Sequence, residues 1–307
     1  MAHTTDTIMM VRPANFGFNA ETAENNAFQS NDRGESKKDI ASQARDEFDA
    51  MVKILRSKGV DIIVVEDTKE PKKPDAIFPN NWISFHDNGA VVTYPMFAKN
   101  RRIERREEII EGLKKSFEVD RRYTFEHYEE NEMYLEGTGS MLFDRDRNIM
   151  YACLSERTDP QIIDKFCVLM GSERVVFHSV DRNGDAIYHT NVMMALGEDF
   201  AVLCTASIAK KEELDHLLNR LEETGKEVVN ISFDQMEAFA GNMLQVRNSS
   251  GDTFLVMSQT AYNSLNEKQI EFLSAKTNLL PINIDTIEYY GGGSVRCMMA
   301  EVFLPRK

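Results

Sequence analysis

Short apolar runs alternate with charged, amphipathic stretches along this chain, and the alternation recurs five times. Each recurrence begins with two β-type runs, continues with a segment of helical periodicity and closes on a further apolar run. The third recurrence reads IYHTNVMMALGEDFAVLCTAS, then KKEELDHLLNRLEETG, then EVVNISF. Short β-type runs predict strands, and apolar positions three and four apart predict a helix with one buried face. The pattern therefore predicts a repeated unit of hairpin, helix and returning strand.

Four of the units run without interruption, and the fifth is split between the two ends of the sequence. Its hairpin begins with YGGGSVRCMMAEVFLP and is completed by TIMMVRP, a helical segment and DIIVVED. We expect the five helices to cover residues 102–117, 159–170, 210–225, 266–276 and 39–59. One such unit cannot bury its apolar faces alone, so five of them stacked round an axis are expected. This predicts an α/β fold, a five-bladed propeller with pseudo-five-fold symmetry, in which residues 1–307 form a single domain.

Composition limits the partners of such a fold. The chain has 36 Lys and Arg against 50 Asp and Glu, which gives a formal net charge of −14. An acidic chain is unsuited to the phosphate backbone of a nucleic acid, and the sequence has no run of about 18 apolar residues to cross a membrane. We expect a cytoplasmic protein with a small soluble substrate. Its four cysteines lie far apart without CxxC pairs, so we expect free thiols rather than disulfides or a zinc site.

Small polar residues gather where each hairpin begins, and these positions would meet near the axis. They are Asn80-Asn81, Glu136 to Gly139, His189 to Asn191, Gly241-Asn242 and Gly291 to Cys297. A cysteine, a histidine and a glutamate brought together there would supply a nucleophile, a general acid/base and a carboxylate that orients substrate. The pattern thus predicts an active site at the axis.

The same residue types also have ordinary structural uses. Cys153, Cys167 and Cys204 sit in apolar runs, where a cysteine is most often a small buried hydrophobe. Cys297 differs because it follows an arginine and three glycines, which let the backbone approach a ligand closely. The pattern alone leaves both interpretations of Cys297 open, and it favours a structural role for His189.

Three of these stretches together resemble the guanidino-group-modifying superfamily, or penteins, which includes arginine deiminase, dimethylarginine hydrolase and the amidinotransferases. LEGTGS is similar to the family's Glu-Gly-Gly-Asp segment, YHTNVM to its His-x-Asp segment and GGGSVRCMM to its C-terminal nucleophile segment. The resemblance covers most of the chain and implies the pentein fold, a five-fold pseudosymmetric α/β propeller. It also implies a catalytic carboxylate at Glu136, a general acid/base at His189 and a nucleophile at Cys297, with neither a metal nor an organic cofactor.

Two further stretches resemble deiminase segments that hold the α-carboxylate of the substrate. They are YPMFAKNRRIE and CLSERTDPQ, so the resemblance assigns this role to Arg101 and Arg157. The chemistry agrees, because a planar guanidinium can bind a carboxylate through two hydrogen bonds. The alternative is that both are surface arginines, one at a helix start and one in a loop.

Two departures from the deiminase pattern bear on the substrate. Deiminases carry aspartates that grip the cationic guanidinium, whereas the matching positions here are Asn81 in FPNN and Asn191 in HTN. A buried cation without its anions is costly, while a neutral ureido group offers N–H donors and a C=O acceptor that amides satisfy. RPANFGFN and FPNNWISF also resemble the citrulline-utilisation hydrolases. We therefore expect hydrolysis of citrulline to ornithine, ammonia and carbon dioxide through a covalent thiol intermediate.

Other functions stay open on the sequence alone. Among enzymes they are arginine or methylarginine deiminase-type hydrolysis and amidino transfer, with Glu136 as the sole anion. Outside the enzymes, the alternative is a non-catalytic pentein that binds a macromolecule. The polar segment over residues 15–39 is expected to be a long loop, and loops of this length are often lids. The sequence leaves the oligomeric state open, including a homo-oligomer.

Overall fold

In the computed structural model, which describes residues 3–307, the strands form five separate three-stranded sheets. In each sheet the first two strands pair antiparallel, and the third pairs parallel to the second. The sheets are β3 (Ile83–Phe85), β4 (Ala90–Thr93) and β5 (Arg121–Thr124); β6 (Leu142–Asp144), β7 (Ile149–Cys153) and β8 (Glu173–Phe177); β9 (Met194–Leu196), β10 (Phe200–Leu203) and β11 (Glu227–Asn230); β12 (Leu244–Arg247), β13 (Thr253–Ser258) and β14 (Asn278–Ile282); and β15 (Ala300–Glu301), β1 (Thr7–Arg12) and β2 (Asp61–Glu66).

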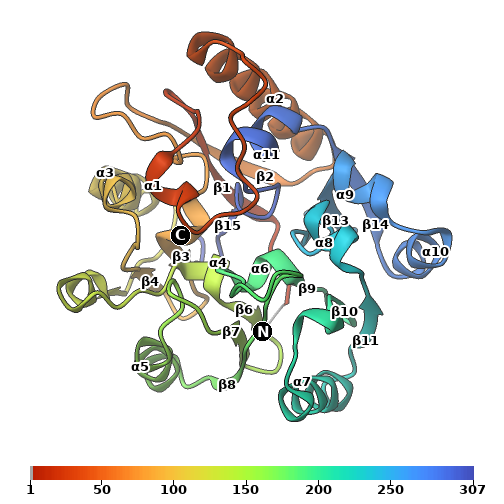
Figure 1. Ribbon diagram of the computed structural model, residues 1–307. Helices are drawn as coiled ribbons and strands as arrows, with labels where there is room; N and C mark the ends of the chain where they lie inside the picture. The colour runs from red at the N-terminus through yellow and green to blue at the C-terminus, as the bar shows by residue number, and fades with distance from the viewer. Residues whose placement is uncertain (1–2) are drawn as a thin grey trace.

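A helical connection joins the second and third strand of every sheet. The helices lie at the rim of the molecule, and the sheets are arranged round the centre (Figure 1). In sheet order the helices are α3 (Glu107–Leu113), α5 (Pro160–Met170), α7 (Lys211–Glu223), the pair α9 (Gln259–Ser264) and α10 (Glu267–Lys276), and α2 (Lys37–Ser57). The predicted α/β propeller of five hairpin-helix-strand units is therefore confirmed.

Local sequence explains where these helices begin and which face they bury. The Ser36 side chain accepts a hydrogen bond from Asp39 N at the start of α2, and Asp159 Oδ1 accepts one from Gln161 N at the start of α5. Such caps satisfy N–H groups that the first helical turn leaves free. The buried residues of α2 lie on one face: Ile40, Ala44, Phe48, Met51, Val52 and Leu55.

The fifth sheet joins the two ends of the described chain. Ile8 pairs with Glu301 across the antiparallel ladder of β1 and β15, and Ile62 on β2 pairs with Ile8 from the other side. The split unit expected from the sequence is present, because one of its strands comes from the C-terminal part and two from the N-terminal part. The assignment of residues 1–307 to a single domain stays a prediction.

Short helical turns stand where the hairpins begin, and they pack against one another at the centre. They include η1 (Pro79–Asn81), α4 (Gly137–Ser140) and α6 (Thr190–Met193). Gly137 has a φ of +47°, and a Cβ at this position would lie 2.3 Å from Asn80 O. The centre is thus packed so closely that only glycine fits there. The remaining elements are α1 (Ala20–Ala23), η2 (Lys99–Glu104), η3 (Glu126–Asn131), η4 (Thr205–Ser207), α8 (Phe233–Glu237) and α11 (Asp285–Gly291).

The helix expected over residues 102–117 is shorter than predicted. Its first part is the 3₁₀ helix η2, Arg105 has extended backbone, and α3 begins only at Glu107. In a 3₁₀ helix residues three apart lie on the same side, so Arg101 and Glu104 point together into the protein. The charged residues of RIERREEIIEG are typical of a solvated helix face, but Glu104 is buried.

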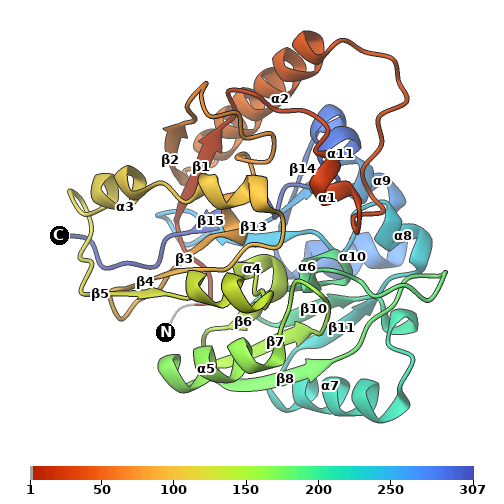
Figure 2. The same cartoon turned by 60° about the vertical axis from the view of Figure 1, so that its left-hand side comes forward.

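Residues 15–36, called the lid segment below, contain α1 and otherwise form a long loop, as expected, whereas residues 37–39 already belong to α2. Figure 2 shows this loop leading from α1 to α2 on one side of the five sheets. Within residues 3–307, no helix is long and apolar enough to cross a membrane.

Candidate active site

Glu136, His189 and Cys297 come together although they belong to three different units. Glu136 precedes α4, His189 precedes α6, and Cys297 follows the turn after α11. Their side chains are buried, and His189 Nε2 lies 2.8 Å from Glu136 Oε2. His189 and Cys297 line the same small cavity. The structure thus places the three residues predicted to be catalytic at the centre of the fold.

Glu136 is held as a carboxylate. Phe97 N donates to its Oε1 at 2.9 Å, and Arg157 Nη1 lies 3.6 Å from its Oε2. Burial acts to raise the pKa of this carboxyl group, but Arg157, His189 and Arg101 outweigh burial and lower the pKa to about 2. The side chain is therefore ionised at neutral pH and can only accept hydrogen bonds.

His189 is neutral at the same pH. Burial lowers the pKa of its imidazole, the contact with Glu136 opposes this, and Arg157 and Arg101 lower the pKa further. Because the Glu136 carboxylate only accepts, Nε2 of the neutral ring carries the proton and Nδ1 keeps its lone pair. Nδ1 is thus the atom of His189 that can take up a proton.

Cys297 lies between two amide groups. Its Sγ is 3.4 Å from Asn191 Nδ2 and 3.3 Å from Asn242 Nδ2. The other three cysteines are free and buried as well, and burial raises the pKa of Cys153 to about 12 and of Cys167 to about 11. The expectation of free thiols is confirmed.

Arg101 is buried and already carries partners of its own. It forms a two-point ion pair with Glu104, with both N–O distances 2.9 Å, and Nη1 donates to Asn81 Oδ1 at 2.9 Å. The Asn81 amide is oriented by this contact, and its Nδ2 is buried without a hydrogen-bond partner among residues 3–307. A substrate carboxylate at Arg101 would have to displace Glu104 or Asn81, so the assigned carboxylate role of Arg101 stays a prediction.

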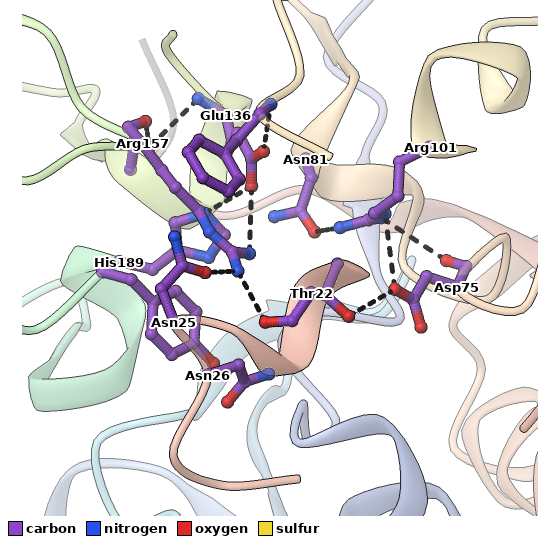
Figure 3. A network of polar contacts seen from close by, with 12 residues as sticks. Thr22, Asn25, Asn26, Asp75, Asn81, Arg101, Glu136, Arg157 and His189 are labelled. Carbon is purple, nitrogen blue, oxygen red and sulfur yellow. Dashed lines mark hydrogen bonds and ion pairs between the residues drawn. The ribbon is translucent and has the colours of Figure 1, made fainter. Parts of the chain in front are cut away.

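Arg157 is also buried, on the other side of the cavity from Arg101 (Figure 3). Its Nη2 donates to Thr22 O at 3.1 Å and to Asn25 Oδ1, and its guanidinium lies 4.7 Å from the centre of the Tyr188 ring. Its Nε has no hydrogen-bond partner within the described chain. The α-carboxylate role assigned to Arg157 likewise stays a prediction.

Asp75 is a second buried carboxylate at the cavity. Its Oδ2 accepts hydrogen bonds from Asn19 Nδ2 at 2.7 Å and Thr22 Oγ1 at 3.2 Å, and lies 3.8 Å from Arg101 Nε. Its Oδ1 has no hydrogen-bond partner among residues 3–307. Burial raises the pKa of Asp75, and Arg101 opposes the rise.

The lid segment is closed over the cavity. Figure 3 shows Thr22 between Arg157 and Asp75, where Thr22 O accepts from Arg157 and Thr22 Oγ1 donates to Asp75. Farther along, Asn26 Nδ2 donates to Gly292 O at 3.4 Å. One loop therefore contacts both charged sides of the cavity and the glycine turn before Cys297.

The cavity between these side chains is small and measures about 300 Å³ when its opening to solvent is included. Four buried polar atoms beside it lack hydrogen-bond partners among residues 3–307. They are Asp75 Oδ1, Asn81 Nδ2, Arg157 Nε and Asn191 Oδ1. Buried polar groups without partners are uncommon, so these atoms are the expected contacts of a polar ligand. In the same part of the chain, no three His, Cys, Asp or Glu side chains are grouped to hold a metal ion.

The sequence did not assign a role to three residues of this site. Asp75 lies in DTKEPKKPDA, a stretch rich in lysine and proline that indicates only a loop, and Glu104 lies in a charged stretch typical of a solvated helix face. The sequence pattern puts Asn242 at a hairpin start but indicates no function for it. The spacing of Arg101 and Glu104, three residues apart, was the one available signal for an ion pair.

One family of known proteins matches most of the chain. Residues 12–304 match the family described as N,N dimethylarginine dimethylhydrolase, eukaryotic. A comparison with curated proteins gave no match.

Similar solved structures share the fold at low sequence identity. The N-terminal domain of ArgZ, an arginine dihydrolase from the ornithine-ammonia cycle in cyanobacteria, has a TM-score of 0.73 and 16% identity, over 97% of this chain and 98% of that chain. Unliganded AgrE has a TM-score of 0.76 and 16% identity, over 98% of this chain and 40% of its own. A dimethylarginine dimethylaminohydrolase adduct has a TM-score of 0.64 and 16% identity, over 97% of this chain and 99% of its own. The chain therefore belongs to the family of N,N dimethylarginine dimethylhydrolases, within the guanidino-group-modifying pentein superfamily, and is a hydrolase acting on C–N bonds.

Proposed function

We propose that this protein is a citrulline ureidase, which hydrolyses citrulline to ornithine, ammonia and carbon dioxide. The orientation of the Asn81 amide carries the proposal. Arg101 Nη1 donates to Asn81 Oδ1, so the amide atom left without a partner is Nδ2, a donor. A donor suits the carbonyl oxygen of a ureido group and has no acceptor to meet on a guanidinium, which presents only N–H groups.

Two acceptors complement this donor. Asn191 Oδ1 has no hydrogen-bond partner among residues 3–307, and Glu136 is an ionised carboxylate in contact with His189. Both suit the N–H groups of the two ureido nitrogens. One donor and two acceptors thus match the one oxygen and two nitrogens of a neutral ureido group.

The amino-acid end of citrulline carries one negative and one positive charge. Arg157, with its free Nε, is the candidate for the α-carboxylate, and Asp75, with its free Oδ1, is the candidate for the α-ammonium group. Thr22 contacts both residues, so the zwitterionic end would lie beneath the lid segment. Arg101 then has a positioning role, because it fixes the Asn81 amide rather than the substrate.

The chemistry begins with transfer of the Cys297 proton to Nδ1 of His189. The thiolate attacks the ureido carbon, the bond to the δ-nitrogen breaks, and the His189 imidazolium protonates that nitrogen as ornithine leaves. Glu136 stabilises the imidazolium through Nε2. Water then gives a proton to Nδ1 and attacks the carbamoyl group on Cys297. The thiolate leaves and takes back that proton, and the released carbamate breaks down to ammonia and carbon dioxide.

A product assay tests this proposal. The purified protein is incubated with citrulline, arginine and an N,N-dimethylated arginine, and ornithine, citrulline and ammonia are measured, with Cys297→Ala as the control. We expect ornithine and ammonia in equal amounts from citrulline, and no product from the control. Turnover of arginine or methylarginine alone would overturn the ureidase proposal.

One observation favours a second candidate, the hydrolysis of a cationic guanidino substrate. Asp75 and Glu136 give the site two carboxylates, one more than the sequence pattern indicated. A cation placed between two carboxylates would be attracted by both. Release of citrulline from arginine or a methylarginine in the same assay would support this candidate, whereas a non-catalytic binding protein would give no product and would not need Cys297.

A further inference from the structure

Asn242 belongs to the fourth unit and contacts the nucleophile directly. It is buried, and its Nδ2 lies 3.3 Å from Cys297 Sγ. Asn191, from the third unit, places a second amide nitrogen 3.4 Å from the same sulfur. Two N–H donors from different units therefore converge on one sulfur atom.

The orientation of the Asn242 amide is fixed from both ends. Its Nδ2 also donates to Asn191 O at 2.9 Å, and its Oδ1 accepts from Arg296 N at 3.1 Å. A rotated amide would place oxygen against the Asn191 carbonyl and nitrogen against the Arg296 N–H, and both contacts are repulsive. Only one orientation satisfies the network, and it points an N–H group at Cys297.

We propose that Asn242 is a positioning residue that stabilises the thiolate form of Cys297, the nucleophile on which the proposed function depends. A thiolate is the reactive form of cysteine and is usually stabilised by a neighbouring cation or a helix N-terminus. Here the neutral His189 is engaged with Glu136 through Nε2, and the amide donors beside the sulfur take the place of a cation. Hydrogen bonds to an ionised acceptor are stronger than those between neutral groups, so both donors favour the thiolate.

The same amide also serves the protonated sulfur. Cys297 Sγ lies 3.7 Å from Asn242 Oδ1, so the thiol can donate to this oxygen, and the thiolate can accept from Nδ2. Sγ therefore stays in place when the proton leaves for His189.

The test is the pH at which the thiolate forms, followed by ultraviolet absorbance and corrected by subtracting the Cys297→Ala counterpart of each protein. We expect Asn242→Ala to move the titration upward by about one to two pH units, as the loss of one hydrogen bond to a charged group predicts. Asn242→Asp keeps the shape but places an anion near the sulfur, so it moves the titration further. Asn248→Ala is the matched control, because Asn248 is a buried asparagine in the turn between β12 and β13. We expect this variant to leave the Cys297 titration unchanged.

Activity provides the second measurement. In Asn242→Ala, kcat/KM at neutral pH falls about tenfold for each unit of the shift and recovers towards the wild-type value as the pH rises. A loss of activity with an unchanged titration and no recovery at high pH would assign Asn242 a purely structural role and overturn the proposal. The thiolate titration needs no substrate, so failure of citrulline turnover would refute the proposed function without deciding the role of Asn242.

Discussion

Asn81→Asp exchanges one amide nitrogen for a carboxylate oxygen and leaves the shape of the cavity unchanged. Oδ1 keeps its hydrogen bond from Arg101 Nη1 at 2.9 Å, so the new anion takes the place of the free Nδ2. The variant removes the donor proposed for the ureido oxygen and offers a charge to a guanidinium. Asn191→Asp acts in the same direction, because it adds a second anion and removes a donor from Cys297.

The size of the effect follows from burial. Asn81 is 2% exposed, so water cannot replace the lost donor, and a buried acceptor left unpaired costs about 1–3 kcal/mol. Since about 1.4 kcal/mol is a factor of ten in rate, kcat/KM for citrulline should fall about 10- to 100-fold in Asn81→Asp. The double variant with Asn191→Asp should lose more, and its ligand preference should move towards cationic amino acids.

The assay compares kcat/KM for citrulline and arginine in the wild type, both single variants and the double variant. Thermal unfolding of each protein controls for misfolding, and Asn248→Asp adds a charge at a buried asparagine outside the cavity as the matched control. An unchanged ratio of citrulline to arginine kcat/KM in the double variant would refute the charge argument. A loss of both activities in equal measure would assign the two amides to general structure rather than to specificity.

Three further outcomes are expected. Gly139→Ala should lower kcat/KM about 100-fold at temperatures where the protein stays folded, because a Cβ there would lie 2.4 Å from Asn81 Nδ2 and displace this amide. Wild-type kinetics in this variant would contradict the prediction. Arg101→Met should lower the free energy of unfolding by about 3–5 kcal/mol by leaving Glu104 buried without its partner, and adding Glu104→Met should restore part of that loss in denaturant titrations. Glu136 has a lower pKa folded, about 2, than its ordinary 4.5, so it stabilises the fold above pH 4.5 and loses this contribution of about 3 kcal/mol as the pH falls towards 2. In Glu136→Gln the unfolding free energy should vary less over that interval, and an equally steep loss would show that other carboxyl groups cause it.

The fold was predictable because the spacing of apolar residues indicates each helix and strand. Each unit buries its own helix face and strands, so the pattern of apolar residues marks every element in turn, even in the split fifth unit. The prediction was wrong at residues 102–106, where η2 and an extended Arg105 replace the first turns of a helix. Charged residues at helical spacing look the same whether they face water or one another, and only the tertiary structure pairs Arg101 with Glu104.

The site was predictable where a residue type has few uses and lies at a hairpin start. Glu136, His189 and Cys297 met both conditions, and the structure places them together. Asp75 met neither, since one aspartate in a loop with lysines and prolines is ordinary, and its role depends on a lid that folds back over it. The hydrogen bonds that orient an amide such as Asn242 depend on three-dimensional contacts that no linear spacing contains.

The pairing of β1 with β15 determines the stage of folding at which the active site can form. Ile8 pairs with Glu301, and of the strand pairings among residues 3–307 this one joins the residues that lie farthest apart in sequence. Pairings between segments distant in sequence are slow to form. Until β1 pairs with β15, Cys297 is not held beside the amides of Asn191 and Asn242. Its thiol then has no hydrogen-bond donors to stabilise the thiolate. A molecule in which β1 separates from β15 should therefore lose its activity while its other four units are still folded. Only the completely folded chain would then carry a reactive cysteine.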